Sequence, residues 1–251
     1  MNDNYFKSMF ESIENQLQEL LKNVESNNKS EKNSFYFERE NFIRTKEREE
    51  CTFKERFSDS SESIGGYGEK LTVFELEFLN SKGYDGNIIS NVYIPRPNGT
   101  TSEIDVLFVT KKGIFVIESK NYSGWIFGSQ NDKYWTVCDY NNKWKLYNPV
   151  LQNQGHINTI HQHLRGVPCF SMIAFSERCE LKKINVNSDI YVFNRDEMFF
   201  IISDIFKKFP DVMDKKQMKY ITEYLGQFCN ADKNIKKSHI KDVKKYSEEK
   251  L

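Results

Sequence analysis

The spacing of apolar residues changes several times along this chain of 251 residues. Between residues 5 and 24, apolar side chains recur three and four positions apart, which predicts an amphipathic helix. The polar stretch 25–34 predicts a linker, and the charge-dense residues 35–57 predict a second helix with one solvated face. Serine and glycine dominate residues 58–68, where we expect a boundary.

From Glu69 onward, the pattern changes to alternating helices and strands. Leu71, Phe74 and Phe78 share one face of a helix that begins at Glu69 and ends before Gly83. Short apolar runs between turn residues then predict strands. These strands are expected at 87–95, 103–110 and 113–120, within 124–137 and 143–149, and at 168–176 and 184–193.

Three helices are predicted after these first strands. Asn148 and Pro149 are a typical helix start, with Asn as the cap and Pro at the first helical position, and this helix should run to about Arg165. Two further helical segments are expected near 196–208 and 214–229. The order of elements predicts an α/β fold with a mixed sheet. We divide the chain into an N-terminal helical segment with its linker (1–63), an α/β core (64–193) and a C-terminal helical extension with a lysine-rich tail (194–251).

Composition narrows the class of protein without naming an activity. The formal net charge is zero, so the overall balance does not demand a polyanionic partner. The five cysteines are scattered, with no C-x-x-C pair, which fits a reducing cytosol better than a disulfide framework. We find no long apolar run and no signal peptide, so we expect a cytoplasmic protein without a membrane segment.

Candidate chemistry lies at the end of the strand pair 103–110 and 113–120. If the two strands close on a two-residue loop at Lys111 and Lys112, then Asp105 lies opposite Glu118, with Cβ atoms roughly 5 Å apart. Lys120 then shares their face, because side chains alternate along a strand. A loop one residue longer would put the two carboxylates on opposite faces, so the expectation depends on this register.

Two carboxylates that meet at the end of a buried strand pair repel each other unless a positive charge lies between them. Carboxylate and carbonyl oxygens are the ligands that Mg²⁺ prefers, so a divalent cation would resolve the conflict. A lysine beside such a site suggests an anionic substrate or an activated water. The set Asp105, Glu118 and Lys120 therefore suggests metal-dependent hydrolysis of a phosphodiester.

The spacing from Asp105 to the segment Glu118-Ser119-Lys120 resembles the PD-(D/E)xK nuclease signature. Five ordered blocks together resemble, more narrowly, the nuclease-related domain (NERD) family. They cover about residues 64–180: GYGE (66–69), EID (103–105), GIFVIESKNYSG (113–124), Trp135 and NPVLQNQGH (148–156). The resemblance implies a mixed-sheet nuclease core that uses Mg²⁺ or Mn²⁺ to cut nucleic acid, DNA in preference to RNA, in bacterial DNA processing or in defence against foreign DNA.

The resemblance also implies roles for individual residues. Asp105 and Glu118 would be metal ligands, together with the Ser119 carbonyl, and Lys120 would orient the attacking water. Glu69 is similar to the family's helix-borne acid, which completes the metal shell. Gln152 resembles a glutamine that often lies beside the site. The chain departs from the superfamily's pattern at Ile104, where proline is usual, although its absence is common in this branch. The first and last sixty or so residues have no counterpart in it.

Other hypotheses remain open at this stage. The chain could be a nucleic-acid-binding module on the same fold without turnover, or a partner-binding adaptor whose N-terminal helical segment makes a homo-oligomer or holds another protein. The lysine-rich tail could follow a phosphate backbone or be a solvated helix. Residues 161–163 invite a zinc interpretation, but side chains two apart on a helix point in different directions. Several aromatic residues could stack on bases or fill the core: Tyr122, Trp125, Tyr134, Trp135, Trp144 and Tyr147.

Overall fold

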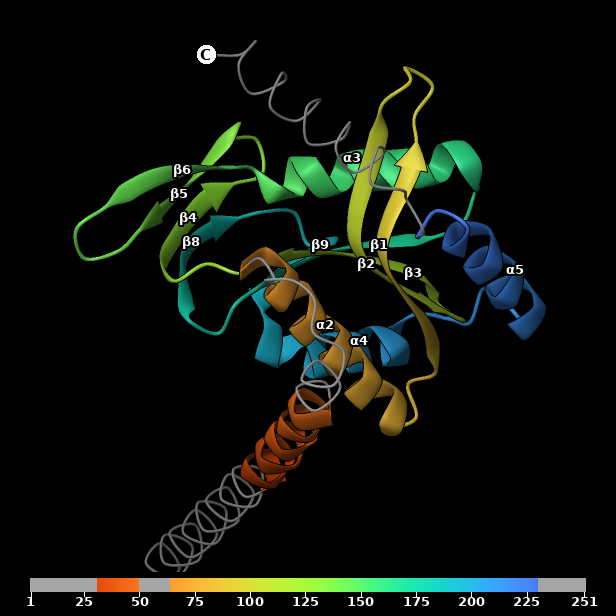
Figure 1. Ribbon diagram of the computed structural model, residues 1–251, viewed down its shortest axis with the longest axis horizontal. Coiled ribbons are helices and arrows are strands. Elements are labelled where there is room, and N and C mark those ends of the chain that lie inside the picture. The colour runs from red at the N-terminus through yellow and green to blue at the C-terminus, as the bar shows by residue number, and fades with distance from the viewer. Residues whose placement is uncertain (1–30, 50–63, 230–251) are drawn as a thin grey trace, which may run out of the picture. The chain divides into compact units, whose positions relative to one another are not determined.

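The computed structural model describes residues 31–49 and 64–229 (Figure 1). The chain divides into two units, residues 1–58 and 59–251. In the first unit, residues 31–49 are helical, so the helix predicted from residue 35 also includes residues 31–34 of the stretch predicted as a linker. Alternating charges stabilise it locally, as in the ion pair of Arg44 with Glu40 one turn away. The helix predicted at 5–24 and the lysine-rich tail lie outside the described residues.

The second unit is an α/β domain with two sheets (Figure 1). Its helices are α2 (Ile64–Ser81), α3 (Pro149–His163), the 3₁₀ turn η1 (Arg195–Glu197), α4 (Met198–Lys208) and α5 (Lys215–Gly226). Its strands are β1 (Gly86–Pro95), β2 (Thr101–Thr110), β3 (Gly113–Lys120), β4 (Gly124–Ser129), β5 (Tyr134–Cys138), β6 (Lys143–Tyr147), β7 (Cys169–Phe175), β8 (Cys179–Asn185) and β9 (Ile190–Asn194).

The larger sheet has the strand order β1-β2-β3-β7-β9 and is mixed, as the sequence predicted. β1, β2 and β3 pair antiparallel, whereas β3, β7 and β9 pair parallel through crossover connections. Thr110 pairs with Gly113, so β2 and β3 close on the two-residue loop that the sequence suggested. This pairing confirms the register on which the candidate site depended.

Helices cover both faces of this sheet, which explains why its strands are apolar on both sides. One face packs against α2 and α4, through residues such as Leu76 and Ile202. The opposite face packs against α3 and α5, through residues such as Ile160 and Leu225 (Figure 1). Successive residues of β2 and β3 alternate between the two cores, so the end of β3 is held firmly from both sides.

The smaller sheet has the order β6-β5-β4-β8. Its inner face carries Ile126, Trp135 and Val137, which pack with Ile173 and Phe175 of β7 in a third apolar cluster. The rings of Trp135 and Phe175 stack with centroids 6.1 Å apart. This sheet is therefore fixed to the larger one by the strand that neighbours β3.

Two predicted boundaries are wrong. Helix α2 starts at Ile64 rather than Glu69, because the glycines between them adopt helical backbone. The strand predicted at 184–193 is two strands in different sheets, β8 and β9. The chain turns between them, where the Ile190 N–H donates to the Asn187 carbonyl at 3.1 Å. Asn, Ser and Asp favour such turns, and the charged residues of β8 hid its strand character.

Asn148 fixes the start of α3 relative to the smaller sheet. Its Oδ1 accepts from the Val150 N–H at 2.9 Å, as the predicted cap should. Its buried Nδ2 also donates to the carbonyls of Ser129, Gln130 and Asp132, at 3.2, 2.9 and 2.6 Å. One side chain therefore ties α3 to the β4–β5 turn and sets where the first turns of α3 lie.

We expect Asn148→Ala to lower the free energy of unfolding by about 2 kcal/mol, since it removes the helix cap and the side-chain hydrogen bonds to the β4–β5 turn. Chemical denaturation monitored by circular dichroism measures this. Asn158→Ala is the matched control, because Asn158 lies exposed on the same helix and only accepts from Gln154. Equal effects of the two substitutions would contradict the anchoring role of Asn148.

Candidate active site

Strands β2 and β3 part at the position of Asp105. Their pairing runs from Thr110–Gly113 to Val106–Ile117 and stops there, one step before Asp105 and Glu118 would pair. The pairing of β1 with β2 also skips Asp105 and Asn91, and Asn91 has a φ of 56°, in the left-handed region. Asp105 thus lies at an irregularity on both sides of β2, as is common beside functional sites.

The end of β3 is nevertheless held in the sheet by β7. Glu118, Ser119 and Lys120 pair in register with Ile173, Ala174 and Phe175. On the side facing β2, the Ser119 N–H donates to Asp105 Oδ2 at 2.8 Å, in place of a backbone partner. The N–H and C=O of one strand residue point to the same side, so the Ser119 carbonyl also faces the gap beside Asp105.

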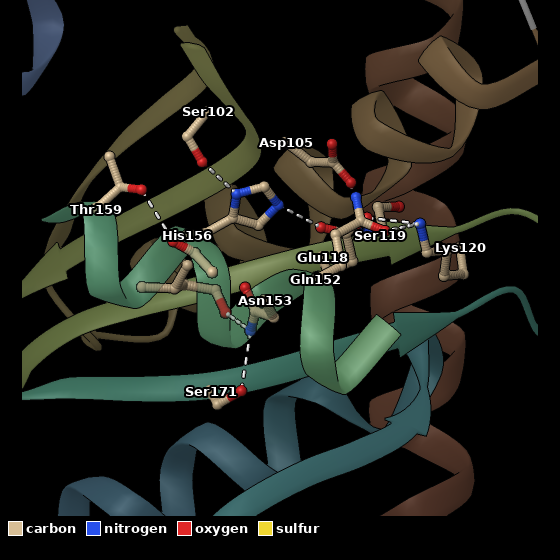
Figure 2. A network of polar contacts seen from close by, with 12 residues as sticks. Ser102, Asp105, Glu118, Ser119, Lys120, Gln152, Asn153, His156, Thr159 and Ser171 are labelled. Atoms are coloured by element: carbon tan, nitrogen blue, oxygen red, sulfur yellow. Dashed lines mark hydrogen bonds and ion pairs between the residues drawn. The ribbon is translucent and has the colours of Figure 1, made fainter. Parts of the chain in front are cut away.

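Glu118 is buried, with 1% of its side chain exposed, and it has a basic partner on each oxygen (Figure 2). Lys120 Nζ lies 2.6 Å from Oε1, and His156 Nε2 lies 3.1 Å from Oε2. Burial alone would raise the pKa of Glu118, but the Lys120 charge and the His156 hydrogen bond outweigh it and lower this pKa to about 2. Glu118 is therefore an anion at neutral pH.

Asp105 has the opposite electrostatic character. Burial raises its pKa well above 3.8, the charges of Glu118 and Glu69 raise it further, and Lys120 and the Ser119 N–H only partly compensate. Burial likewise raises the pKa of Glu69, followed by the charges of Glu103 and Glu118. Negative charge is thus crowded at this end of β2 and β3 beyond what Lys120 neutralises.

Glu69 reaches this cluster because α2 comes unusually close to the end of β3. A Cβ atom on Gly68 would lie 2.7 Å from Asn121 Cβ, so only glycine permits the approach. One turn later, Thr72 Oγ1 lies 3.1 Å from Ser119 Oγ and fixes the contact. The close approach of α2 to β3 therefore explains the glycine at position 68 in the block at 66–69. The sequence alone did not reveal this steric reason.

Helix α3 contributes the other side of the site. Gln152 Oε1 accepts from Lys120 Nζ at 3.1 Å, and His156 contacts Glu118, so both residues point to the end of β3 (Figure 2). Between them, the buried Asn153 Nδ2 donates to the Val116 carbonyl at 2.9 Å and to Ser171 Oγ at 3.0 Å. These bonds attach α3 directly to β3 and β7.

Sequence reasoning missed the residues behind His156. Ser102 Oγ lies 2.7 Å from His156 Nδ1 and accepts from Arg96 Nη2 at 3.0 Å. Arg96 Nε also donates to Thr159 Oγ1, one turn along α3, at 3.3 Å. The carboxylate of Glu118 only accepts, so His156 donates through Nε2, and the Ser102 hydroxyl can donate to Nδ1. Ser102 lies in β2, two residues before Ile104. The alternation of side chains along this strand does not reveal that Ser102 contacts α3.

Other polar residues considered from the sequence lie elsewhere. Glu103 bonds to the Tyr93 hydroxyl, and its charge adds to the burial that raises the pKa of Glu69. His161 Nε2 lies 3.0 Å from the Val167 carbonyl, and His163 contacts Tyr224 and the Pro95 carbonyl. These contacts turn the two histidines toward different partners. Across residues 31–49 and 64–229, no three His, Cys, Asp or Glu side chains are arranged as a metal site.

Comparison with known proteins identifies the family. Residues 64–176 match the family model described as nuclease-related domain. The chain belongs to the NERD family. It is 33% identical over 182 residues to an uncharacterized protein of Bacillus anthracis, and the match covers 70% of this chain and 82% of that relative. No solved structure matches. Within the described residues, no helix of this NERD protein is long and apolar enough to cross a bilayer.

Because Asp105 and Glu118 differ in their electrostatic surroundings, substitutions at the two positions should change stability in opposite directions. Both are compared in EDTA, which removes divalent metal. The pKa of Asp105 is raised in the folded protein, so the wild type loses stability as the pH rises through that value. Asp105→Asn keeps an oxygen that accepts from the Ser119 N–H. Asparagine does not ionise, so the variant does not lose stability as the pH rises. It should therefore melt above the wild type at pH 7, and the difference should vanish below the ordinary pKa of 3.8.

Glu118→Gln should do the reverse and lower the free energy of unfolding by about 3 kcal/mol at pH 7, because it leaves Lys120 without its buried partner. The pKa of Glu118 is lowered, so this stability is present above 4.5 and fades as the pH falls toward about 2. Thermal melts in EDTA across the pH range measure both variants. Shifts of the same sign in both would contradict the asymmetry between the two carboxylates.

Proposed function

We propose that this protein is a metal-dependent nuclease that hydrolyses phosphodiester bonds, in DNA in preference to RNA. The observation that carries the proposal is the convergence of Asp105, Glu118 and Lys120 at the point where β2 and β3 part. Membership of the NERD family supports the same reading, since its family model is described as nuclease-related. The activity would take place beside the N-terminal half of α3, in the gap next to Asp105.

The residues present fit a Mg²⁺ or Mn²⁺ ion with few protein ligands. Asp105 Oδ1 makes no hydrogen bond with the described residues, although its partner oxygen is held by Ser119. Burial, followed by the charges of Glu118 and Glu69, raises its pKa, and a bound cation would favour the ionised form. Asp105, Glu118 and the Ser119 carbonyl supply the hard oxygen donors, and Glu69 is placed to assist directly or through water. Magnesium commonly binds one or two carboxylates and retains several waters.

When bound, such an ion would polarise a phosphate and lower the pKa of a coordinated water. The protein's own contribution is to position charge. Lys120 has a raised pKa, because the charges of Glu118 and Asp105 outweigh the effect of its burial, so it remains an ammonium group. Lys120 therefore acts by orienting water and stabilising negative charge on the phosphate, while Gln152 Oε1 holds Nζ in place.

His156, Ser102 and Arg96 act as positioning residues for Glu118. Each is held by the next, from the Arg96 guanidinium through Ser102 to the imidazole, and the chain ends on Glu118 Oε2. Such support fixes the orientation of a ligating carboxylate, as second partners do in metal sites. Because this chain of hydrogen bonds ends on Oε2, Oε1 of Glu118 is left to contact Lys120. The Glu118 carboxylate and the Lys120 ammonium group would then keep one geometry during the reaction.

Cleavage of linear duplex, circular and single-stranded DNA, and of RNA, tests the proposal with Mg²⁺, Mn²⁺ or EDTA. We expect metal-dependent cutting by the wild type and none by Glu118→Gln or Asp105→Asn. Lys120→Ala should lower kcat by about 10²- to 10³-fold, with less effect on the metal concentration required. Asp204→Asn and Lys207→Ala are matched controls, because both residues are exposed on α4, away from the site.

Wild-type rates in Glu118→Gln or Asp105→Asn would remove these residues from the mechanism. An unchanged kcat in Lys120→Ala would remove the lysine. Folded wild-type protein that binds nucleic acid but cuts none of the substrates with either metal would replace the nuclease by a binding module on the same fold.

A further inference from the structure

The outer face of the smaller sheet, formed by β6, β5, β4 and β8, is not used by the candidate active site. Its register sorts the side chains cleanly, because directly paired residues share a face. Trp135, Val137 and Ile126 point inward and are fully buried. Their neighbours along each strand therefore point outward, on a surface that none of the three apolar clusters includes.

Aromatic side chains occupy this outer face. Trp125 is 52% exposed and pairs with Cys138, and Tyr147 is 47% exposed and pairs with Tyr134. Phe127, paired with Thr136 between them, is half-buried. Of the aromatic residues that the sequence left open between core and base stacking, Trp135 belongs to the core, whereas Trp125 and Tyr147 are exposed on the outer face.

Lysines lie between these rings. Lys143 and Lys145 pair with Cys138 and Thr136, which places them on the same outer face. Lys182 lies at a bulge opposite β4, with Nζ 5.5 Å from the centre of the Trp125 ring. Lys183 pairs with Phe127, so the bulge brings two consecutive lysines to one side.

Acidic side chains are scarce on the same surface. The four strands contain the lysines Lys143, Lys145, Lys182 and Lys183 and the single acid Glu180. Glu180 is already bonded to Lys182. Lys145 and Lys133 also flank Tyr134, with Nζ 5.6 and 4.9 Å from its ring centre. The face thus combines excess positive charge with exposed rings.

We propose that this outer face binds single-stranded nucleic acid. The lysines match a phosphate backbone, and the rings match bases whose faces are exposed because they are unpaired. A duplex offers the same phosphates but hides its base faces, so the aromatic residues favour the single strand. The inference rests on the proposed nuclease function and deepens it, since it names the form of substrate that the protein holds outside the gap beside Asp105.

Binding in EDTA tests the inference without cleavage. Fluorescence anisotropy would compare labelled oligo(dT) and oligo(U) of about 16 nucleotides with a DNA duplex of the same length. We expect the single strands to bind at least about tenfold more tightly than the duplex. DNA and RNA should both bind, because base stacking is tolerant of sequence, and the ratio of their Kd values tells which one the face prefers.

The double variant Trp125→Ala, Tyr147→Ala should weaken single-strand binding by about tenfold or more. Trp125→Phe, Tyr147→Phe should restore most of it. Tyr220→Ala, which removes an exposed tyrosine on α5, is the matched control and should bind as the wild type does. Wild-type affinity in the double alanine variant would overturn the proposal, as would equal affinity for duplex and single strand.

A charge variant keeps the test valid if loss of the aromatic residues impairs folding. Lys143→Gln, Lys145→Gln, Lys182→Gln should reduce the slope of log Kd against log salt by up to about 2, or roughly 0.7 for each lost contact. The same number of substitutions at Lys207, Lys215 and Lys216 should leave the slope unchanged, and equal slopes in both triple variants would overturn the proposal.

The two proposals fail separately. Metal-dependent cutting without any single-strand binding through this face would end the inference and leave the nuclease intact. Tight binding that depends on Trp125 and Tyr147, with no cutting under any condition, would do the opposite.

Discussion

The buried charge of Glu118 is the constraint on which the rest of the site depends. A carboxylate with 1% exposure is tolerated only when each oxygen has a basic or hydrogen-bonding partner. Lys120 comes from the same strand and His156 from α3, so the helix must lie in one place for the charge to be stable. The hydrogen bonds of Asn148 and Asn153 hold the helix there. Asn148 bonds to the smaller sheet and Asn153 to the larger one, so both sheets determine the position of α3.

Asp105 differs from Glu118 in its electrostatic surroundings. Asp105 lies where β2 parts from β3, and burial, followed by the charges of Glu118 and Glu69, raises its pKa. Glu118 thus has a partner on each carboxylate oxygen, whereas the neighbouring Asp105 has one only on Oδ2 among the described residues. Such a difference between adjacent groups is typical of functional sites, where one group holds the structure and another remains available to a ligand.

Much of this could be predicted from the sequence, because it depends on local rules. The two-residue loop at Lys111 and Lys112 fixed the strand register, and Asn148-Pro149 marked the helix that carries Gln152 and His156. The chain of Arg96 and Ser102 behind His156 could not be found this way, since it joins a turn, a strand and a helix whose packing no local pattern encodes. The break at Asn91 escaped notice because a left-handed asparagine leaves no distinct signature in an alternating strand.

In the smaller sheet, the sequence pattern alone does not tell which aromatic residues are buried and which are exposed. The strand register is needed as well. Every aromatic residue in its strands reads as a strand former, and pairing alone decides that Trp135 is inside while Trp125 and Tyr147 are outside. Trp125 and Tyr147 are therefore exposed on the same face. The lysines on the same face supply the positive charge on which the proposal of a nucleic-acid partner is based. The inner face of this sheet packs on β7, the strand that also holds the end of β3, so the proposed binding face and the proposed active site are supported by the same strand.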